Sequence, residues 1–415
     1  MSHIEFTKEM KKTHKILIPM MLPIHFQFLE NILTKEGYHV ELLDNTSLSV
    51  KEEGLKYVHN DTCYPALLVI GQMIDALKSG KYDVDHVALA ITQTGGGCRA
   101  SNYIHLLRKA LIQAGFPQVP VISVNFANLE KQSGFYFTLP MLIKLLYGFL
   151  YADLLLWLKN QCKPYELDKG NTDSLVSHWI TTISKQFDSL TFLQLSKNYK
   201  AIITSFNQIK RSDEKKIKVG IVGEIYMKYA PLGNQHLEDF LMHENCEPIL
   251  TATLDFGLYC LKNVQIDYRY YHRNHQGYAI SKCAIWYMMH LTKKANRILS
   301  KQSNFMLPDT FDELYACHEG FIDAGAKMGE GWLLTSEIVS FLKHGITNIV
   351  CCQPFGCLPN HIVAKGMIRK IKTKFPEANI VCVDYDPSAT SVNQENRLKL
   401  MLSNATLNET MHTTK

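Results

Sequence analysis

Four cysteines in three glycine- or proline-rich segments have the surroundings that point most directly to chemistry in this 415-residue chain. Cys63 lies in NDTCYPALL, Cys98 ends TGGGC, and Cys351 and Cys357 lie in CCQPFGCLPNH. The four cysteines map to strand-end loops that lead into helices, rather than to the interiors of strands or helices. Helix N-termini carry unpaired N–H groups and partial positive charge, so they favour the thiolate, the form of cysteine that binds metal. The spacing therefore predicts metal-ligating thiolates.

The glycines before Cys98 suit one kind of metal group in particular. Gly95, Gly96 and Gly97 allow the backbone to approach an inorganic sulfide and to direct N–H groups at it. With Arg99 beside them, they are candidate cofactor-binding residues for an iron–sulfur cluster. Three alternatives remain open: a phosphate cradle, a zinc site and a single nucleophilic cysteine. The chain has no G-x-x-x-x-G-K-[ST] motif and no C-x-x-C pair, and one nucleophile would account for one segment but not for three.

Other polar residues in comparable turns are secondary candidates. Glu330 in GEGW is a candidate proton donor or a structural hydrogen-bonding group. His361 follows the last cysteine segment and could act on a cluster sulfide or a substrate, or stabilise a helix N-terminus. Arg99 could neutralise the charge of a cluster or pair with a carboxylate. Asp384 and Asp386 in DYDP could bind a divalent ion, although such aspartates more often cap a turn or a helix.

The elements that position these residues alternate between short apolar runs and longer amphipathic ones, the signature of parallel α/β layering. The predicted fold is multidomain α/β, with Rossmann-like parallel sheets, flanking helices and the cluster site at strand-end loops between domains. In open α/β sheets, ligands bind at the carboxyl ends of strands. The predicted strands are 14–20, 38–43, 86–92, 119–125, 217–224, 248–253, 347–353 and 378–384. The predicted domains are an N-terminal α/β domain (1–138), a helical connecting region (139–215), a middle α/β domain (216–304) and a C-terminal α/β domain (305–415).

Composition narrows the class of protein. A hydrophobic fraction of 46% and a charged fraction of 20% are typical of a soluble protein, and the net charge of +5 is not clustered as nucleic-acid binding requires. The apolar stretch 139–158 contains Lys144 and Asp153, so we expect a buried helix and no membrane association. The N-terminus has no features of a secretory signal, so we expect a cytoplasmic protein whose eleven cysteines are reduced.

Several longer segments resemble a known family. They are NDTCYPALLVIGQMIDALKSGKYD, ITQTGGGCRASNYIHLLRKAL, VGIVGEIYMKYAPLGN, GEGWLLTSEI, CQPFGCLPNHIVAKGMI and DYDPSATSVNQENRLKLM, which lie between residues 60 and 401. The resemblance extends over about residues 14 to 402. They are similar to the acyl-CoA dehydratase activase-related proteins of the 2-hydroxyacyl-CoA dehydratase and double-cubane cluster protein superfamily. One departure from the family pattern is Ser388, where we expect a glycine after DYDP.

The resemblance implies a [4Fe-4S] cluster, or a double-cubane [8Fe-9S] cluster, held by Cys63, Cys98, Cys351 and Cys357. In the dehydratases three thiolates hold each cubane and one iron stays open to substrate. The resemblance favours Cys351 over Cys352, and Cys317 or Cys352 would be further ligands if six were needed. It also implies a separate ATP-hydrolysing activator that delivers low-potential electrons, and a homodimer or a heterodimer. The expected function is reductive or radical chemistry on an acyl-CoA or another small molecule; the alternative is a non-catalytic electron-transfer or accessory subunit.

Overall fold

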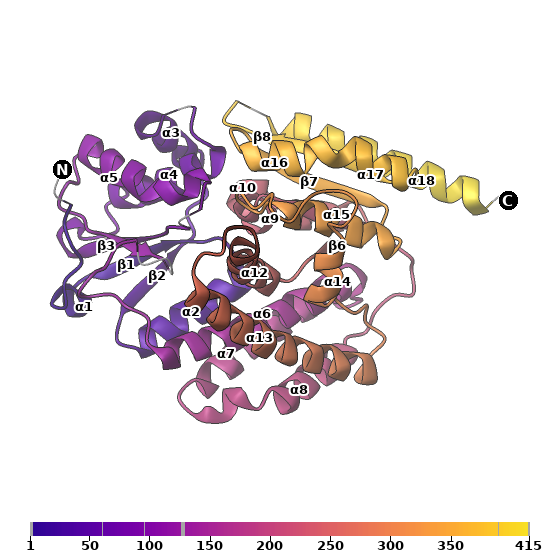
Figure 1. Cartoon of the computed structure of the whole chain (residues 1–415), viewed down its shortest axis with the longest axis horizontal. Coiled ribbons are helices and arrows are strands. Elements are labelled where there is room, and N and C mark those ends of the chain that lie inside the picture. The colour runs from indigo at the N-terminus through magenta and orange to yellow at the C-terminus, as the bar shows by residue number, and fades with distance from the viewer. Residues whose placement is uncertain (1–2, 60, 95, 126–128, 389, 414–415) are drawn as a thin grey trace.

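Two four-stranded parallel sheets organise the chain (Figure 1), so the mixed α/β fold class is confirmed. The computed structural model describes residues 3–413 apart from 60, 95, 126–128 and 389, and for residues 407–413 it describes the backbone alone. The first sheet has the order β2-β1-β3-β4 and the second has the order β6-β5-β7-β8. The strands are β1 (Lys15–Pro19), β2 (His39–Leu43), β3 (Val87–Thr92), β4 (Val121–Val124), β5 (Ile217–Gly223), β6 (Cys246–Leu250), β7 (Asn348–Pro354) and β8 (Asn379–Tyr385).

Helices surround both sheets and form a layer of their own below them in Figure 1. Within the described residues the α-helices are α1 (Met10–Thr13), α2 (Pro23–Lys35), α3 (Leu48–Tyr57), α4 (Tyr64–Lys78), α5 (Tyr103–Ala114), α6 (Leu139–Cys162), α7 (Asn171–Gln186), α8 (Leu195–Asn207), α9 (Ile225–Tyr229), α10 (Pro231–Asn234), α11 (Leu237–His243), α12 (Thr253–Tyr271), α13 (His275–Gln302), α14 (Phe311–Ala316), α15 (Trp332–Lys343), α16 (Leu358–Val363), α17 (Ile368–Lys374) and α18 (Ser391–Thr413). A short 3₁₀ segment, η2 (Arg99–Asn102), precedes α5.

The two sheets share one topological feature that matters for function. In each sheet the first strand along the chain is flanked by the second strand on one side and by the third on the other. The strand order therefore reverses direction between β1 and β3, and again between β5 and β7. Ligands of open α/β sheets bind in the crevice at the carboxyl ends of the strands at such reversal points. Sheet topology therefore directs attention to the loops that follow β1, β3, β5 and β7.

Helix α6 is the apolar stretch that resembles a membrane span. By length and composition alone, the helical stretch Leu139–Tyr165 could cross a membrane, and half of its most apolar window is buried in the fold. The two charged residues inside the apolar stretch 139–158 have partners. Lys144 pairs with Glu36 at 2.7 Å, and Asp153 contacts His25 at 2.9 Å. The leucines of its buried face belong to a core cluster shared with α2, α7 and α8. These contacts are those of a core helix, which passes the same composition test.

The eight predicted strands are all present, and their ends shift by at most three residues. Helices α3 and α12 were not predicted, and neither were the short helices α1, α9, α10 and α14. The predicted division between a middle and a C-terminal α/β domain near residue 304 needs correction. Strands β5 and β6 lie in the same sheet as β7 and β8, because β7 pairs with β5 in parallel register. The residues between β6 and β7 form a long helical insertion in that sheet.

Candidate functional site

The segments that carry Cys63 and Cys357 lie against each other. Cys63 is the N-cap of α4 and Cys357 is the N-cap of α16. The backbone N–H of Tyr64 donates to the carbonyl of Phe355 at 3.0 Å. Gly356 has a φ of +73°, and a Cβ at this position would lie 3.1 Å from the Cα of Cys63. Only glycine fits this left-handed, close approach without strain, so the residue type at position 356 is what brings the two cysteine loops together.

The Cys98 segment joins the same place from the first sheet. It follows β3, and Cys98 is the N-cap of η2. The guanidinium of Arg99 donates to the backbone carbonyl of Asp61, two residues before Cys63. A Cβ on Gly97 would overlap the side chain of Met328, whereas a Cβ on Gly96 would meet open space. The overlap involves only the flexible end of the exposed Met328 side chain, so this contact does not by itself require glycine at position 97. Arg99 positions one cysteine loop against another.

Two carboxylates lie between these loops. Glu224 follows β5 directly and caps α9, accepting the N–H of Met227 at 2.9 Å. Glu330 Oε1 accepts the N–H of Ile225 at 2.9 Å, and the side chain is buried. Burial and, next, the charge of the nearby Glu330 together raise the pKa of Glu224 to about 8, so at neutral pH its protonated, uncharged form is favoured. The pKa of Glu330 is also raised, first by burial.

The carboxylates place the three thiols around one centre. Burial is the first cause that raises the pKa of Cys63, to about 11, and the pKa of Cys98 and Cys357 is raised by burial as well. The charge of Glu224 raises the pKa of all three thiols, and that of Cys98 acts on the other two. Electrostatic influence falls with distance, so all three thiols lie near Glu224, and Cys98 and Cys357 also lie near Glu330. The structure thus brings together three of the four predicted cysteines. Cys98 follows β3 and Cys357 follows β7, at the reversal points of the two sheets, whereas Cys63 lies between α3 and α4 and not in the strand-end loop predicted for it.

The thiols differ from expectation in one respect. All three occupy N-cap positions, which we expected to favour thiolate. Burial and the neighbouring carboxylates outweigh that effect and raise the thiol pKa in each case. In the metal-free protein the thiols are therefore protonated at neutral pH, and any metal that binds them must displace protons.

The prediction that Cys351 lies in a strand-end loop is wrong. Strand β7 continues to Pro354, because Gln353 and Pro354 still pair with β8. Cys351 is fully buried inside the strand, opposite Cys382 in the register, in a core cluster that also includes Ile338. A hydrogen bond with Cys382 raises the pKa of Cys351 and lowers that of Cys382. The charge of Cys357 also acts on Cys351, so these two thiols lie near each other.

The remaining predicted residues occupy less central positions. The side chain of His361 is exposed and hydrogen-bonds to Gln353, with the His361 Nε2 at 2.9 Å from the Gln353 Nε2. Asp384 pairs with Arg397 at 3.0 Å, and Asp386 accepts the N–H of Ser388 at 2.7 Å. The aspartates thus hold a helix and a turn, the commoner role of such residues. Gly95 lies outside the described residues.

Two residues near the thiols were missed by sequence analysis. The hydroxyl of Tyr103 and the thiol of Cys63 are hydrogen-bonded at 2.7 Å, and Tyr103 is buried at the start of α5. Glu224 is the second. Its signal is visible in VGIVGE, where a carboxylate ends an otherwise apolar strand. Tyr103 gives no comparable signal, because an aromatic residue at a helix start is ordinary core.

Comparisons with known proteins do not assign this site. Neither a scan against protein-family models nor a search of curated proteins found a match. Within the described residues, no group of three or more His, Cys, Asp or Glu side chains is close enough to hold a single metal ion. A cubane spreads its ligands over several iron atoms, so its ligands stand farther apart than those of one ion.

The raised pKa of Glu224 leads to a prediction on pH and stability. The pKa of Glu224 in the folded protein, about 8, lies above its ordinary value of 4.5, so between these pH values the folded state binds more protons than the unfolded state. The stability that Glu224 contributes is then complete below pH 4.5 and is lost as the pH rises toward 8, by up to about 1.4 kcal/mol per unit. We expect Glu224→Gln in the metal-free protein to flatten this slope, measured as denaturation midpoints between pH 5 and pH 9.

The exposed Glu319 provides the matched control. Glu319→Gln should leave the slope of stability against pH as it is in the unmodified protein. An unchanged slope in the Glu224 variant would contradict the protonated, buried state of this carboxyl.

Proposed function

We propose that this protein is an iron–sulfur protein similar to the 2-hydroxyacyl-CoA dehydratases, with Cys63, Cys98 and Cys357 as ligands of a [4Fe-4S] cluster. In this proposal a separate ATP-hydrolysing activator supplies low-potential electrons. The substrate is an acyl-CoA or another small molecule that undergoes reductive or radical chemistry. The proposal refines the predicted Rossmann-like arrangement, because the cluster would lie between the carboxyl ends of the two sheets.

The observation that carries the proposal is the convergence of three thiols from three separate loops. Residues 63, 98 and 357 are far apart in the sequence, yet the charge of Glu224 raises the pKa of all three thiols. Packing of small apolar side chains does not require three cysteines at N-cap positions around two carboxylates. Three thiolates with a fourth position left open are the arrangement that the family resemblance implies.

The surroundings fit such a group. Thiolate sulfur is the donor that iron–sulfur clusters use. A cluster held by thiolates is anionic, so it would be destabilised by two ionised carboxylates nearby. Burial raises the pKa of Glu224, to about 8, so this carboxyl is mainly neutral at pH 7, and burial raises the pKa of Glu330 as well; both shifts reduce that repulsion. When bound, the cluster would supply one-electron transfer at low potential.

The chain itself would contribute a proton source next to the thiols. Glu330 Oε1 is occupied by the N–H of Ile225, so the proton favoured by burial is held at Oε2. The charge of Glu330 acts on Cys98 and on Cys357, which places the carboxyl beside two proposed ligands. We assign to Glu330 the role of donating a proton to the substrate. His361, which is exposed and bonded to Gln353, is the weaker candidate for that role.

Metal analysis tests the proposal directly. We expect the full chain, purified without oxygen and reconstituted with iron and sulfide, to hold about four iron and about four sulfide per chain and to absorb broadly near about 400 nm. Serum albumin, taken through the same procedure, serves as the control for adventitious iron because it carries a free thiol. Less than about one iron per chain, or about one zinc without colour, would sink the proposal.

A further inference from the structure

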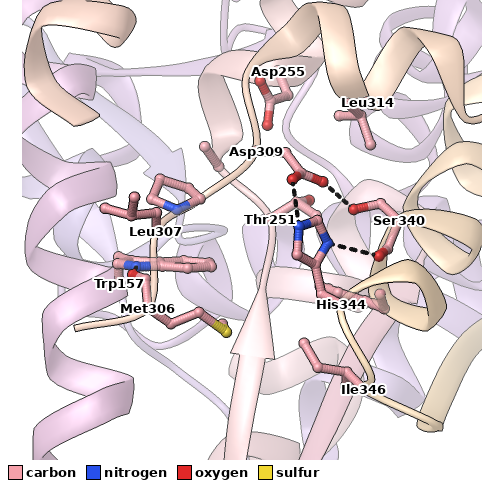
Figure 2. A pocket seen from close by; sticks show the side chains of 13 residues that line it. Trp157, Thr251, Asp255, Met306, Leu307, Asp309, Leu314, Ser340, His344 and Ile346 are labelled. Carbon is pink, nitrogen blue, oxygen red and sulfur yellow. Dashed lines mark hydrogen bonds and ion pairs between the residues drawn. The ribbon is translucent and has the colours of Figure 1, made fainter. Parts of the chain in front are cut away.

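A second candidate site lies away from the thiols, at the carboxyl end of β6. Two adjoining pockets share Trp157, Asp255 and Asp309, and the larger one holds about 720 Å³ of empty space, part of which is open to solvent. Figure 2 shows the smaller one, with α6 on one side and α15 on the other. We refer to the combined space as the Asp255 hollow.

Two of the acidic residues at the hollow are already engaged by the protein. Asp309 accepts from the hydroxyl of Ser340 and pairs with His344 Nε2 at 3.3 Å, as the dashed lines in Figure 2 mark. Asp153 accepts the backbone N–H groups of Thr253 and Leu254 at 2.7 and 3.0 Å. Both carboxylates therefore have structural roles, in fixing α15 and in capping α12.

Asp255 differs from both. In the part of the chain that the structure describes, the Asp255 carboxyl group makes no hydrogen bond or ion pair, and it lines both pockets. Burial raises its pKa well above the usual value, and Asp153, Glu337 and Asp309 raise it further. Lys228 is the neighbouring cation that lowers it, but that ammonium is paired with Glu337 at 2.8 Å. The hollow therefore has an excess of acidic groups and one carboxyl group without a partner.

The rest of the wall is mainly apolar and partly aromatic. Trp157, Phe311 and Phe341 line the two pockets together with leucine and proline side chains. An adjoining smaller hollow shares Trp157 and is lined by Asn160, whose buried Oδ1 has no hydrogen-bond partner within the described residues. Aromatic faces attract cations, and unpartnered acceptor oxygens need donors. A hard metal ion takes six or more oxygen ligands, which an apolar wall with one free carboxylate does not provide.

We propose that the Asp255 hollow binds a small primary alkylammonium ion, with the ammonium group paired to Asp255 and the carbon chain against Trp157. The ammonium supplies the hydrogen-bond donors that Asp255 lacks. The apolar wall accommodates the chain, so the site selects an organic amine over an inorganic cation. This proposal is independent of the iron–sulfur site, since it involves none of the clustered cysteines.

Binding would also release a proton. Asp255 is held protonated in the empty hollow by burial and by the carboxylates that face it, Asp153 from α6, Glu337 from α15 and Asp309 from the loop before α14. The bound ammonium ion stabilises the ionised carboxylate, so the proton on Asp255 is released to solvent. The ammonium group keeps its three N–H protons. Calorimetric titration in two buffers of different ionisation enthalpy measures this release.

The test is a titration of the full chain with n-butylammonium chloride at constant ionic strength. We expect saturable binding with release of up to one proton per ligand, a weakening of at least about tenfold in Asp255→Asn, and no change in the exposed control Asp213→Asn. 1-Butanol, which has the same chain length and no charge, should bind at least about tenfold more weakly. The proposal would be overturned if 1-butanol bound as tightly as n-butylammonium, if Asp255→Asn bound n-butylammonium as tightly as the unmodified protein, or if n-butylammonium showed no saturable binding.

A second measurement locates the ligand even if the Asp255 variant is unstable. In protein labelled with 5-fluorotryptophan, n-butylammonium should shift the ¹⁹F signal of Trp157 and leave that of the exposed Trp286 unchanged. A shift at Trp286 alone, or at neither position, would contradict the placement of the site.

Discussion

Replacing Cys98 by serine is expected to reduce iron–sulfur loading from about four iron per chain to below about one. The same loss is expected for Cys63→Ser and Cys357→Ser, because a cubane that loses one of three thiolates has no replacement in a buried site. A serine hydroxyl is far less acidic than a thiol, and burial already raises the pKa of these thiols. Loading is measured as iron, acid-labile sulfide and visible absorbance after anaerobic reconstitution.

Cys283 provides the matched control, because it is free and exposed on α13. Cys283→Ser should load iron normally. Cys351→Ser tests the remaining predicted ligand. Because Cys351 hydrogen-bonds to Cys382 within a strand, we expect it to keep most of its iron. Full loading by Cys98→Ser would remove the proposed site; loss of loading in Cys351→Ser would restore Cys351 as a ligand.

Much of the fold could be predicted because the strands are buried on both faces. Such strands read as continuous apolar runs, as in VALAIT and KVGIVG, and the helices between them have clear periodicity. The connection between β6 and β7 could not be predicted in the same way. It contains almost a hundred residues of helix and loop, and local sequence does not reveal that a strand after such an insertion returns to the same sheet.

The candidate site was predictable to the level of its loops. The positions of Cys63, Cys98 and Cys357 before helices were visible in the sequence, because proline and glycine mark those turns. Three further features depend on tertiary structure alone. The strand β7 extends past Cys351 through pairing with β8, Tyr103 reaches Cys63 from another helix, and Glu224 meets Glu330 across 106 positions of the chain.

The pKa of the thiols shows why local reasoning about the site was incomplete. An N-cap position is a local property, and on its own it favours thiolate. Burial and the charge of Glu224 are properties of the assembled fold, and they act in the opposite direction on Cys63. For a buried group the desolvation cost exceeds the effect of a helix terminus, so the sign of the shift follows the fold.

Breaking the buried ion pair between Lys228 and Glu337 is expected to give the largest loss of stability in the second sheet. Their side chains are 4% and 5% exposed, and the Lys228 Nζ lies 2.8 Å from a Glu337 carboxylate oxygen. Thr251 donates to the same carboxylate at 2.6 Å. Burial acts to lower the pKa of Lys228, and the Glu337 charge overcomes it, so the pair is ionised. Lys228→Met leaves an unpaired buried carboxylate, which should reduce the free energy of unfolding by about 3–5 kcal/mol.

The comparison with an exposed pair and with the double variant separates charge burial from simple loss of a contact. Lys293 and Asp312 are paired at 3.0 Å with side chains about half exposed, so Lys293→Met should cost less than about 1 kcal/mol. Adding Glu337→Met to Lys228→Met removes the unpaired charge and should recover more than about 1 kcal/mol of the loss. Denaturant titrations of the metal-free chain measure the unmodified protein, the single variants Lys228→Met, Glu337→Met and Lys293→Met, and the double variant. If the double variant is as unstable as the sum of its single variants, the two side chains contribute by packing, and the unpaired charge is not what destabilises the second sheet.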